Sequence, residues 1–408
     1  MKLLSGEPPL PAQLRSHSCC DGTSPEALQV ESILGLCARA QANPAMACRL
    51  VAETDLFSNW ERLLIRAEQH GLGPLIYLHL KGTGALVPQE AERALKALSI
   101  RHRHANGVRQ QILIEILNLC ASQDIPVLVL KGAALAFLVY PQPGLRCMRD
   151  IDLLVRTGDA QRAQALLKKE GFELYNGSDL AMPAGHHHLP VLARQIEGLK
   201  VCVEVHDDLF PATRYYHSMQ FDDLVGKAID FQIGDVPART LGYEDMLWHI
   251  YRHAIGPPLL ASPLRFIHLA DLVSLVEARF EQIDWESLRH CYPQVYQILP
   301  LLHFLTPWSQ PVLDRLNFLS HFKPLQQVGL DYQGWPRHRL RLGVRKADWE
   351  TLKQTLLPPE WWQRLYYAAG GRGDWLWARY IRHPFHLAEW LGHYIREDLS
   401  NLVKSTVG

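Results

Sequence analysis

The chain has 408 residues, of which 48% are apolar, and it carries 42 basic and 42 acidic side chains. This length predicts one to three domains around a sizeable core. The balanced charge gives no general attraction to nucleic acid or to an anionic membrane. The eight cysteines include no C-x-x-C pair, which favours buried thiols in a reducing cytoplasm. We see no segment with the length of a signal peptide or a membrane span, so we expect a cytoplasmic protein without a membrane partner.

The N-terminal part of the chain predicts a tail followed by helices. Residues 1–24 are rich in Pro, Ser and Gly and are predicted to be disordered. Apolar side chains at helical spacing then predict a helical region at 25–123. Its expected helices are Pro25 to about Thr54, Phe57 to Leu80 with a break at Gly71–Pro74, and Pro88 to about Ser122. This region leads into an expected core at 124–235.

The first part of that core, 125–155, predicts two strands joined by a short helix. An apolar run typical of a buried strand comes first. Lys131-Gly132 then opens a segment of small residues, and a Pro/Gly turn ends it. Acids occupy alternate positions of the second strand. The expected elements are Ile125–Leu130, Ala133–Tyr140, the turn Pro141–Gly144 and Asp150–Val155.

The alternation of acids on the second strand indicates a metal site. Side chains on a strand change face at every residue, so Asp150 and Asp152 share one face. Two adjacent carboxylates repel each other, and each costs free energy if it is desolvated alone. Mg²⁺ removes this conflict and is often held by one or two carboxylates together with substrate phosphates. Gly132, where a strand passes into a helix, can bring backbone N–H groups close to phosphate.

A second alternating strand follows. Thr157–Glu170 predicts a helix, Phe172–Tyr175 a strand, and 176–190 a loop that contains His186, His187 and His188. On the strand Val201–His206, the valines face one way, while Cys202, Glu204 and His206 face the other. His206 could orient a ligand or shuttle protons near neutral pH. The three loop histidines are expected either to be solvated or to contact an acceptor.

Residues 236–408 predict a second helical region. A hinge is expected at Gly370–Gly373 and a break at Pro384, while 303–345 has no clear pattern. The Trp, Tyr, His and Arg side chains of the tail predict packing, with a membrane-surface or partner-binding role as the alternative. The expected helices are Tyr243–Ala254, Leu264–Arg279, Trp285–Leu302, Lys346–Ala369 and Trp375–Leu402.

The pattern Leu130-Lys131-Gly132, then Gly144-x-Arg146, then Asp150-Ile151-Asp152-Leu153-Leu154-Val155 resembles the polymerase-β-type nucleotidyltransferase superfamily. More closely, it resembles the bacterial uncharacterised nucleotidyltransferase family, which has Lys-Gly where better-known members have Gly-Ser. The resemblance extends from about Trp60 to about Trp285. It implies an α/β (α+β) fold: a small mixed, mostly antiparallel sheet with helices against one face, flanked by N- and C-terminal helical regions.

The resemblance also implies a reaction and its residues. The superfamily carries a third carboxylate on the strand beside the Asp-x-Asp strand, and Glu204 is the matching residue. The implied reaction moves an NMP from an NTP to an unidentified small-molecule or protein acceptor, with Mg²⁺ or Mn²⁺. The predicted catalytic residues and metal ligands are Asp150, Asp152 and Glu204. The predicted NTP contacts are Lys131, Gly132 and Arg146.

Other interpretations stay open. The serine that usually contacts phosphate is missing, which leaves a nucleotide-binding or scaffold protein that keeps the fold without turnover. A nucleic-acid-modifying enzyme is disfavoured by the neutral charge and by the lack of a basic patch interleaved with aromatic residues. For single residues, Asp150 and Asp152 can be the exposed face of an edge strand, and Gly132 can be only a tight turn.

Overall fold

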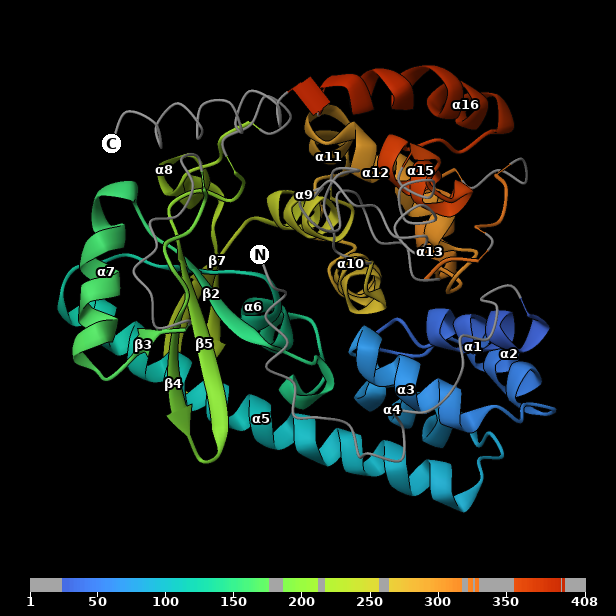
Figure 1. Cartoon of the computed structure of the whole chain (residues 1–408), viewed down its shortest axis with the longest axis horizontal. Helices are drawn as coiled ribbons and strands as arrows, with labels where there is room; N and C mark the ends of the chain where they lie inside the picture. Colours follow the sequence, from blue (N-terminus) through green and yellow to red (C-terminus); the bar gives the residue numbers. More distant parts are fainter. Residues whose placement is uncertain are drawn as a thin grey trace, which may run out of the picture. The chain divides into compact units, whose positions relative to one another are not determined.

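The computed structural model (Figure 1) describes residues 24–175, 186–211, 217–256, 264–317, 322–325, 327–329, 356–389 and 391–392. Its contacts divide the chain into two compact units. The larger unit contains residues 33–254 and 265–318, and the smaller contains 1–32, 255–264 and 319–408. The predicted disordered tail lies outside the described residues except for Ser24, and the predicted division at 123 and 235 stays a prediction.

The predicted helix Pro25 to about Thr54 is divided at residues 37–43, whereas the predicted break at Gly71–Pro74 is present. The Asn43 side chain accepts a hydrogen bond from the Met46 N–H at the start of the second helix, which satisfies a free donor. Gly71 and Gly84 end the third and fourth helices in the left-handed region, which favours glycine. The helices are α1 (Pro25–Leu36), α2 (Pro44–Thr54), α3 (Trp60–His70), α4 (Gly73–Thr83) and α5 (Gln89–Ser122).

The larger unit contains a five-stranded sheet (Figure 1), in the order β1-β2-β5-β4-β3. Only the β2–β5 pair is parallel, so the sheet is mixed and mostly antiparallel, as predicted. The strands are β1 (Leu128–Val129), β2 (Asp150–Leu154), β3 (Glu173–Leu174), β4 (Leu192–Ile196) and β5 (Leu199–His206).

The hairpin β6 (Ile229–Ile233) and β7 (Val236–Thr240) was not predicted. Its apolar residues alternate at 229, 231 and 233, and Gly234 takes the positive φ that its turn requires. This alternation could have predicted the hairpin from the sequence. The strand β4 was not predicted either, and it has a weaker pattern because it mixes apolar and polar residues.

The two faces of the sheet differ as the alternation predicts. Ile151, Leu153 and the β5 valines are buried on one face. The helices α5 and α7 (Thr157–Lys169) pack against β5. On the other face the register sets Asp152 directly beside Glu204, and Leu154 beside His206. The parallel pair thus brings together acids that are 52 positions apart on different strands.

The segment between β1 and β2 is fixed by hydrogen bonds to its neighbours. The Leu130 N–H donates to the Asp152 carbonyl at 2.9 Å, so the chain leaves β1 beside Asp152. The helix α6 (Lys131–Leu138) begins there, and the 3₁₀ turn η2 (Pro143–Leu145) follows. The buried Asn106 side chain on α5 donates to the carbonyls of Pro143 and Arg146, both at 2.7 Å. Asn106 therefore anchors the loop that enters β2.

Helices form the rest of the described chain. The predicted helix 285–302 is divided at Tyr292–Pro293. The larger unit contains α8 (Phe221–Leu224), η3 (Val225–Lys227), α9 (Tyr243–Ala254), α10 (Phe266–Ala278), α11 (Trp285–Cys291), α12 (Pro293–Leu302) and α13 (Gln310–Arg315). The smaller unit contains α15 (Glu360–Tyr367), α16 (Arg372–Trp377) and the π-helical turn η4 (Ala378–Arg382). No helix among the described residues has the length and apolarity needed to cross a bilayer.

The predicted break at Pro384 is wrong, since the helix continues through it to residue 389. The π-helical turn of η4 comes directly before Pro384, and such a turn changes the hydrogen-bond ladder where proline cannot donate. Residues 346–355 of the predicted helix Lys346–Ala369 lie outside the described residues.

We expect Asn106→Leu to lower the free energy of unfolding, because two buried carbonyls lose their donors. The cost should be about 1–3 kcal/mol for each carbonyl left unsatisfied. Urea denaturation measures it, with Asn118→Leu at an exposed position of the same helix as the matched control. Equal stability of the two variants would show that Asn106 does not anchor the loop.

Candidate active site

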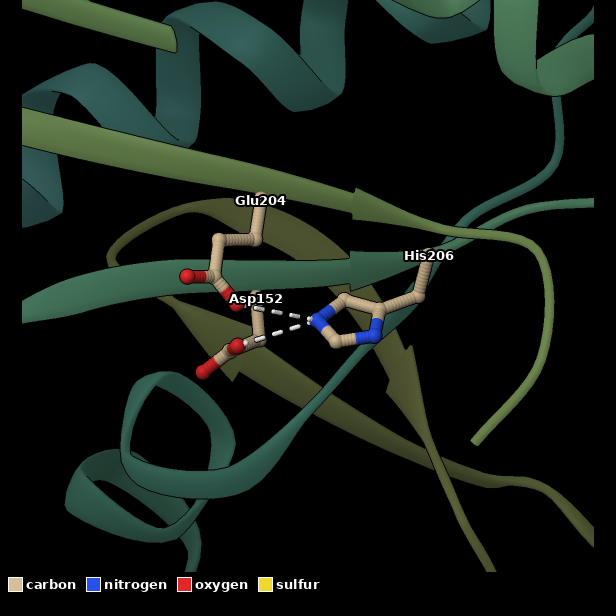
Figure 2. A group of neighbouring side chains, drawn as sticks. All are labelled: Asp152, Glu204 and His206. Atoms are coloured by element: carbon tan, nitrogen blue, oxygen red, sulfur yellow. Dashed lines mark hydrogen bonds and ion pairs between the residues drawn. The ribbon is translucent and has the colours of Figure 1, made fainter. Parts of the chain in front are cut away.

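Three side chains meet on the polar face of β2 and β5 (Figure 2). The Nε2 atom of His206 lies 3.1 Å from Oδ1 of Asp152 and 3.5 Å from Oε2 of Glu204. One ligand atom from each of the three residues lies within 4.8 Å of the other two. Asp152 and His206 are buried, and Glu204 is partly exposed. Two oxygens and one nitrogen thus lie close together, and Glu204 is the member of the group that reaches solvent.

The Asp152 carboxylate is stabilised by two neighbouring cations. Lys131 Nζ lies 2.8 Å from the same Oδ1 atom that faces His206. Burial disfavours the charged carboxylate, but Lys131 and His206 outweigh it and hold the pKa of Asp152 well below its usual range. Burial likewise disfavours charge on Lys131 and His206, yet the acids raise the pKa of both side chains. The buried acid is therefore ionised and internally paired.

Asp150 is in the opposite situation. It shares the polar face with Asp152 but pairs in register with Cys202, not with Glu204. Burial, followed by the charges of Asp152 and Glu204, raises its pKa to about 6. Burial and the neighbouring acids thus outweigh the cations around Asp150.

The loop histidines lie against this cluster. His188 forms an isolated β-bridge with His206, and its Nε2 lies 4.0 Å from Oε2 of Glu204. The rings of His186 and His187 stack at 5.3 Å, and the His187 ring lies 5.2 Å from that of His206. Burial lowers the pKa of His186 to about 4 and that of His187 to about 2, with neighbouring histidines adding to the effect. These imidazoles are therefore neutral at pH 7 and are weak bases.

Arg146, a predicted NTP contact, is buried and already paired. Its Nε and Nη2 atoms donate to the two carboxylate oxygens of Asp271 on α10, at 3.1 and 2.6 Å. Its Nη1 donates to the Cys147 carbonyl at 2.8 Å, and the Tyr140 hydroxyl donates to the same Asp271 at 2.7 Å. This bidentate pair argues against a direct phosphate contact by Arg146 and gives it a positioning role instead.

Gly132 lies directly against that guanidinium. A Cβ atom at Gly132 would lie 2.8 Å from Cζ of Arg146, closer than real Cβ contacts allow. The absence of a side chain is therefore explained by Arg146 packing, without a ligand. The preceding residue, Lys131, has a φ of 48°, in the left-handed region that is strained for a residue with a side chain. The left-handed turn at Lys131 lies between β1 and α6, and the side chain of the same residue contacts Asp152.

Other cations lie near the Asp150 end of the site. Burial lowers the pKa of Arg109 on α5, and the Asp150 carboxylate partly offsets this effect. The Nε and Nη1 atoms of Arg109 are buried and have no hydrogen-bond partner among the described residues. Burial, together with neighbouring Arg149 and Arg146, lowers the pKa of Arg265 to about 10. Arginine side chains held near one another repel, so an anion bound between them would be stabilised.

Sequence reasoning missed Asp271, Arg109 and Arg265 as neighbours of the site. Asp271 had one signal, since it is an acid in the middle of the apolar helix α10 (FIHLADLVSLVEA). Arg109 lay on the predicted long helix with nothing to distinguish it from the other basic residues there. His188 and His206 were noticed, but the bridge between them was not foreseen.

Comparison with known proteins identifies a family and one structural likeness. Residues 58–294, more than half of the chain, match the model of a family described as uncharacterised nucleotidyltransferase. The resemblance found in the sequence motifs is thereby confirmed. Among solved structures, the chain is similar to the solution structure of the antibiotic-resistance factor ANT(2″)-Ia. The identity is 17% and the TM-score 0.30, covering 48% of this chain and 96% of that one. No curated protein matches the chain.

We expect Gly132→Ala to destabilise the protein, because the new methyl group must move the Arg146 guanidinium away from Asp271. Breaking a buried ion pair costs about 3–5 kcal/mol. Chemical denaturation measures the effect, with Gly158→Ala on α7 as the control. A methyl group at Gly158 meets no atom within 4 Å, so that variant should be neutral or slightly stabilised. Indistinguishable behaviour of the two variants would contradict the packing described here.

We expect the Asp150 carboxyl to contribute a loss of stability to the metal-free protein as pH rises from about 4 to 6, because its pKa is about 6 when folded. Over this range Asp150 binds more protons in the folded than in the unfolded state, so its contribution to the free energy of unfolding falls with pH. Asp150→Asn should remove this slope and stabilise the protein at pH 7 by on the order of 1–3 kcal/mol. The gain should vanish below about pH 4. Denaturation across pH in the presence of a chelator tests it, with exposed Asp235→Asn as the control.

Proposed function

The chain belongs to the family of uncharacterised nucleotidyltransferases, and we propose from this membership that it transfers an NMP from an NTP to an acceptor with Mg²⁺. The observation that carries the proposal is the register of β2 and β5. It sets Asp152 beside Glu204, with Asp150 on the same face of the sheet. Three carboxylates on one face suit a site for divalent cations and triphosphate.

The residues present fit a divalent cation. Asp152, Glu204 and His206 offer donor atoms within 4.8 Å of one another, and burial together with the adjacent carboxylates Asp152 and Glu204 raises the pKa of Asp150. We propose that Asp150, Asp152 and Glu204 hold the cation. When bound, such ions lower the pKa of the attacking group and stabilise the leaving pyrophosphate.

We propose that Lys131, Arg109 and Arg265 receive the triphosphate. Lys131 has three N–H donors, of which Asp152 occupies one, so two are available for phosphate oxygens. Arg109 has donors without protein partners near Asp150, and Arg265 adds charge there. Arg146 then acts by fixing Gly132 and the start of α6. The backbone N–H groups at that helix start remain proposed phosphate contacts.

We propose that the acceptor enters beside the loop histidines. His186 and His187 are neutral at pH 7, so the loop presents uncharged ring nitrogens that can hydrogen-bond an acceptor hydroxyl or amine. The acceptor is a small molecule or a protein. A nucleotide-binding protein without turnover is the alternative, which is favoured by the missing phosphate-binding serine.

We expect Asp152→Asn to reduce NMP transfer by more than about 100-fold, the loss typical of one electrostatic contact to a transition state. Glu204→Gln should lower kcat more than NTP affinity, because it would act mainly in the transition state. Radiolabelled NTPs with cell extract and Mg²⁺ measure transfer, and a thermal-shift series of the four NTPs measures binding.

Asp235→Asn is the matched control, and circular dichroism checks that each variant folds. Mg²⁺-dependent NTP binding by the wild type without any labelled product would favour the non-catalytic alternative. Full transfer activity of Asp152→Asn at saturating metal would exclude the proposed site.

A further inference from the structure

We propose that His206 and His188 turn this carboxylate site into a mixed oxygen–nitrogen centre that binds a divalent transition metal, of the Zn²⁺ and Mn²⁺ class, in the absence of nucleotide. The inference deepens the proposed function and rests on it for the role of the same carboxylates. The sequence motif implied acids only. The structure adds imidazole nitrogens, and imidazole changes which metal a site prefers.

The first observation is the position of His206 Nε2. It lies 3.1 Å from Asp152 Oδ1 and 3.5 Å from Glu204 Oε2 (Figure 2). Ligand atoms about 2.0–2.2 Å from one metal ion, the usual length of Zn–N and Zn–O bonds, are about 3–3.5 Å apart. The two distances from His206 therefore match the spacing of ligands around one ion, and all three donors lie within 4.8 Å of one another. His206 is fully buried, so its ring cannot turn into solvent to avoid that arrangement.

The second observation concerns His188. Its Nδ1 lies 2.8 Å from the Leu189 carbonyl oxygen, which can only accept a hydrogen bond, so Nδ1 carries the proton. In the neutral ring Nε2 then has a free lone pair, and this atom lies 4.0 Å from Glu204 Oε2. A backbone carbonyl that fixes the tautomer is the usual support of a metal-binding histidine. The β-bridge to His206 holds the backbone of His188 at the same end of β5.

The combined donor set distinguishes between metals. Mg²⁺ takes oxygen ligands and keeps several waters, so His206 and His188 add nothing to its binding. Zn²⁺ accepts both imidazole and carboxylate, and Mn²⁺ tolerates such mixed sites. Asp152, Glu204 and His206 would be the inner ligands, and His188 would complete the set through a small movement toward Glu204.

Lys131 provides an independent check on this arrangement. Its Nζ shares Asp152 Oδ1 with His206, so an ion that takes this oxygen must compete with the ammonium group. Removing the lysine charge should therefore strengthen metal binding. If the cluster had a purely structural role, removing the lysine would destabilise the protein without strengthening metal binding, because it would leave a buried carboxylate unpaired.

The test is titration of the nucleotide-free protein with Zn²⁺, Mn²⁺ and Mg²⁺ by calorimetry, with Co²⁺ absorption spectra to report nitrogen ligation. We expect one tight Zn²⁺ per chain. His206→Gln and His188→Gln should each weaken Zn²⁺ binding at least about 10-fold, the scale of a lost ligand or its support. Mg²⁺ affinity should stay within about 2-fold, and Lys131→Met should tighten Zn²⁺ binding. Exposed His290→Gln on α11 is the matched control.

Unchanged Zn²⁺ affinity in both His206→Gln and His188→Gln would overturn the proposal, as would equal losses in His290→Gln, which would indicate adventitious surface binding. Thermal unfolding of the metal-free variants shows whether each still folds, and a folded variant with lost Zn²⁺ binding supports the proposal. The outcome is separable from the proposed function. Mg²⁺-dependent NMP transfer without tight Zn²⁺ binding would leave the function standing alone, while Zn²⁺ binding without transfer would leave the metal centre standing alone.

Discussion

The arrangement of the site depends on the compensation of one buried charge, the Asp152 carboxylate. Only 2% of Asp152 is exposed, and a buried carboxylate costs several kcal/mol unless it is paired. Lys131 and His206 pair with it through one oxygen. These two cations face three carboxylates, since Asp150 and Glu204 lie on the same face. Burial, followed by the charges of Asp152 and Glu204, raises the pKa of Asp150, so the acids are least well compensated there.

That compensation requires several distant parts of the chain to meet. The Leu130 N–H bonds to the Asp152 carbonyl, and the left-handed turn at Lys131 directs its side chain toward the carboxylate. The start of α6 is held from behind by Arg146, which is fixed by Asp271 on α10. The C-terminal helical part of the larger unit is therefore a structural component of the site. A change on α10 can alter the position of Lys131 without touching a substrate.

The local features of this molecule were predictable from sequence, and the long-range ones were not. Alternation alone placed Asp150 with Asp152 and Glu204 with His206, because a strand has a strict period of two. The family resemblance supplied the mixed sheet and the neighbouring carboxylate. The partner of Arg146 is 125 positions away, and no periodicity reports such a contact, so the ion pair of this predicted NTP contact could not be foreseen. The packing of Gly132 against the same arginine was missed for the same reason. The helix through Pro384 depends on a π-helical turn, which leaves no composition signal.

The replacement of Gly-Ser by Lys-Gly in this family has a physical consequence for metal binding. A serine hydroxyl can donate to phosphate but cannot neutralise a buried carboxylate, whereas Lys131 does so in the protein alone. The site is consequently preformed, with its acids held near one another before any cation arrives. A cation held by Asp152 as proposed would compete with the Lys131 ammonium group, and Lys131 Nζ would then be available to the phosphates. The lysine can in this way link occupation of the metal site to recognition of the triphosphate, a coupling that serine could not provide.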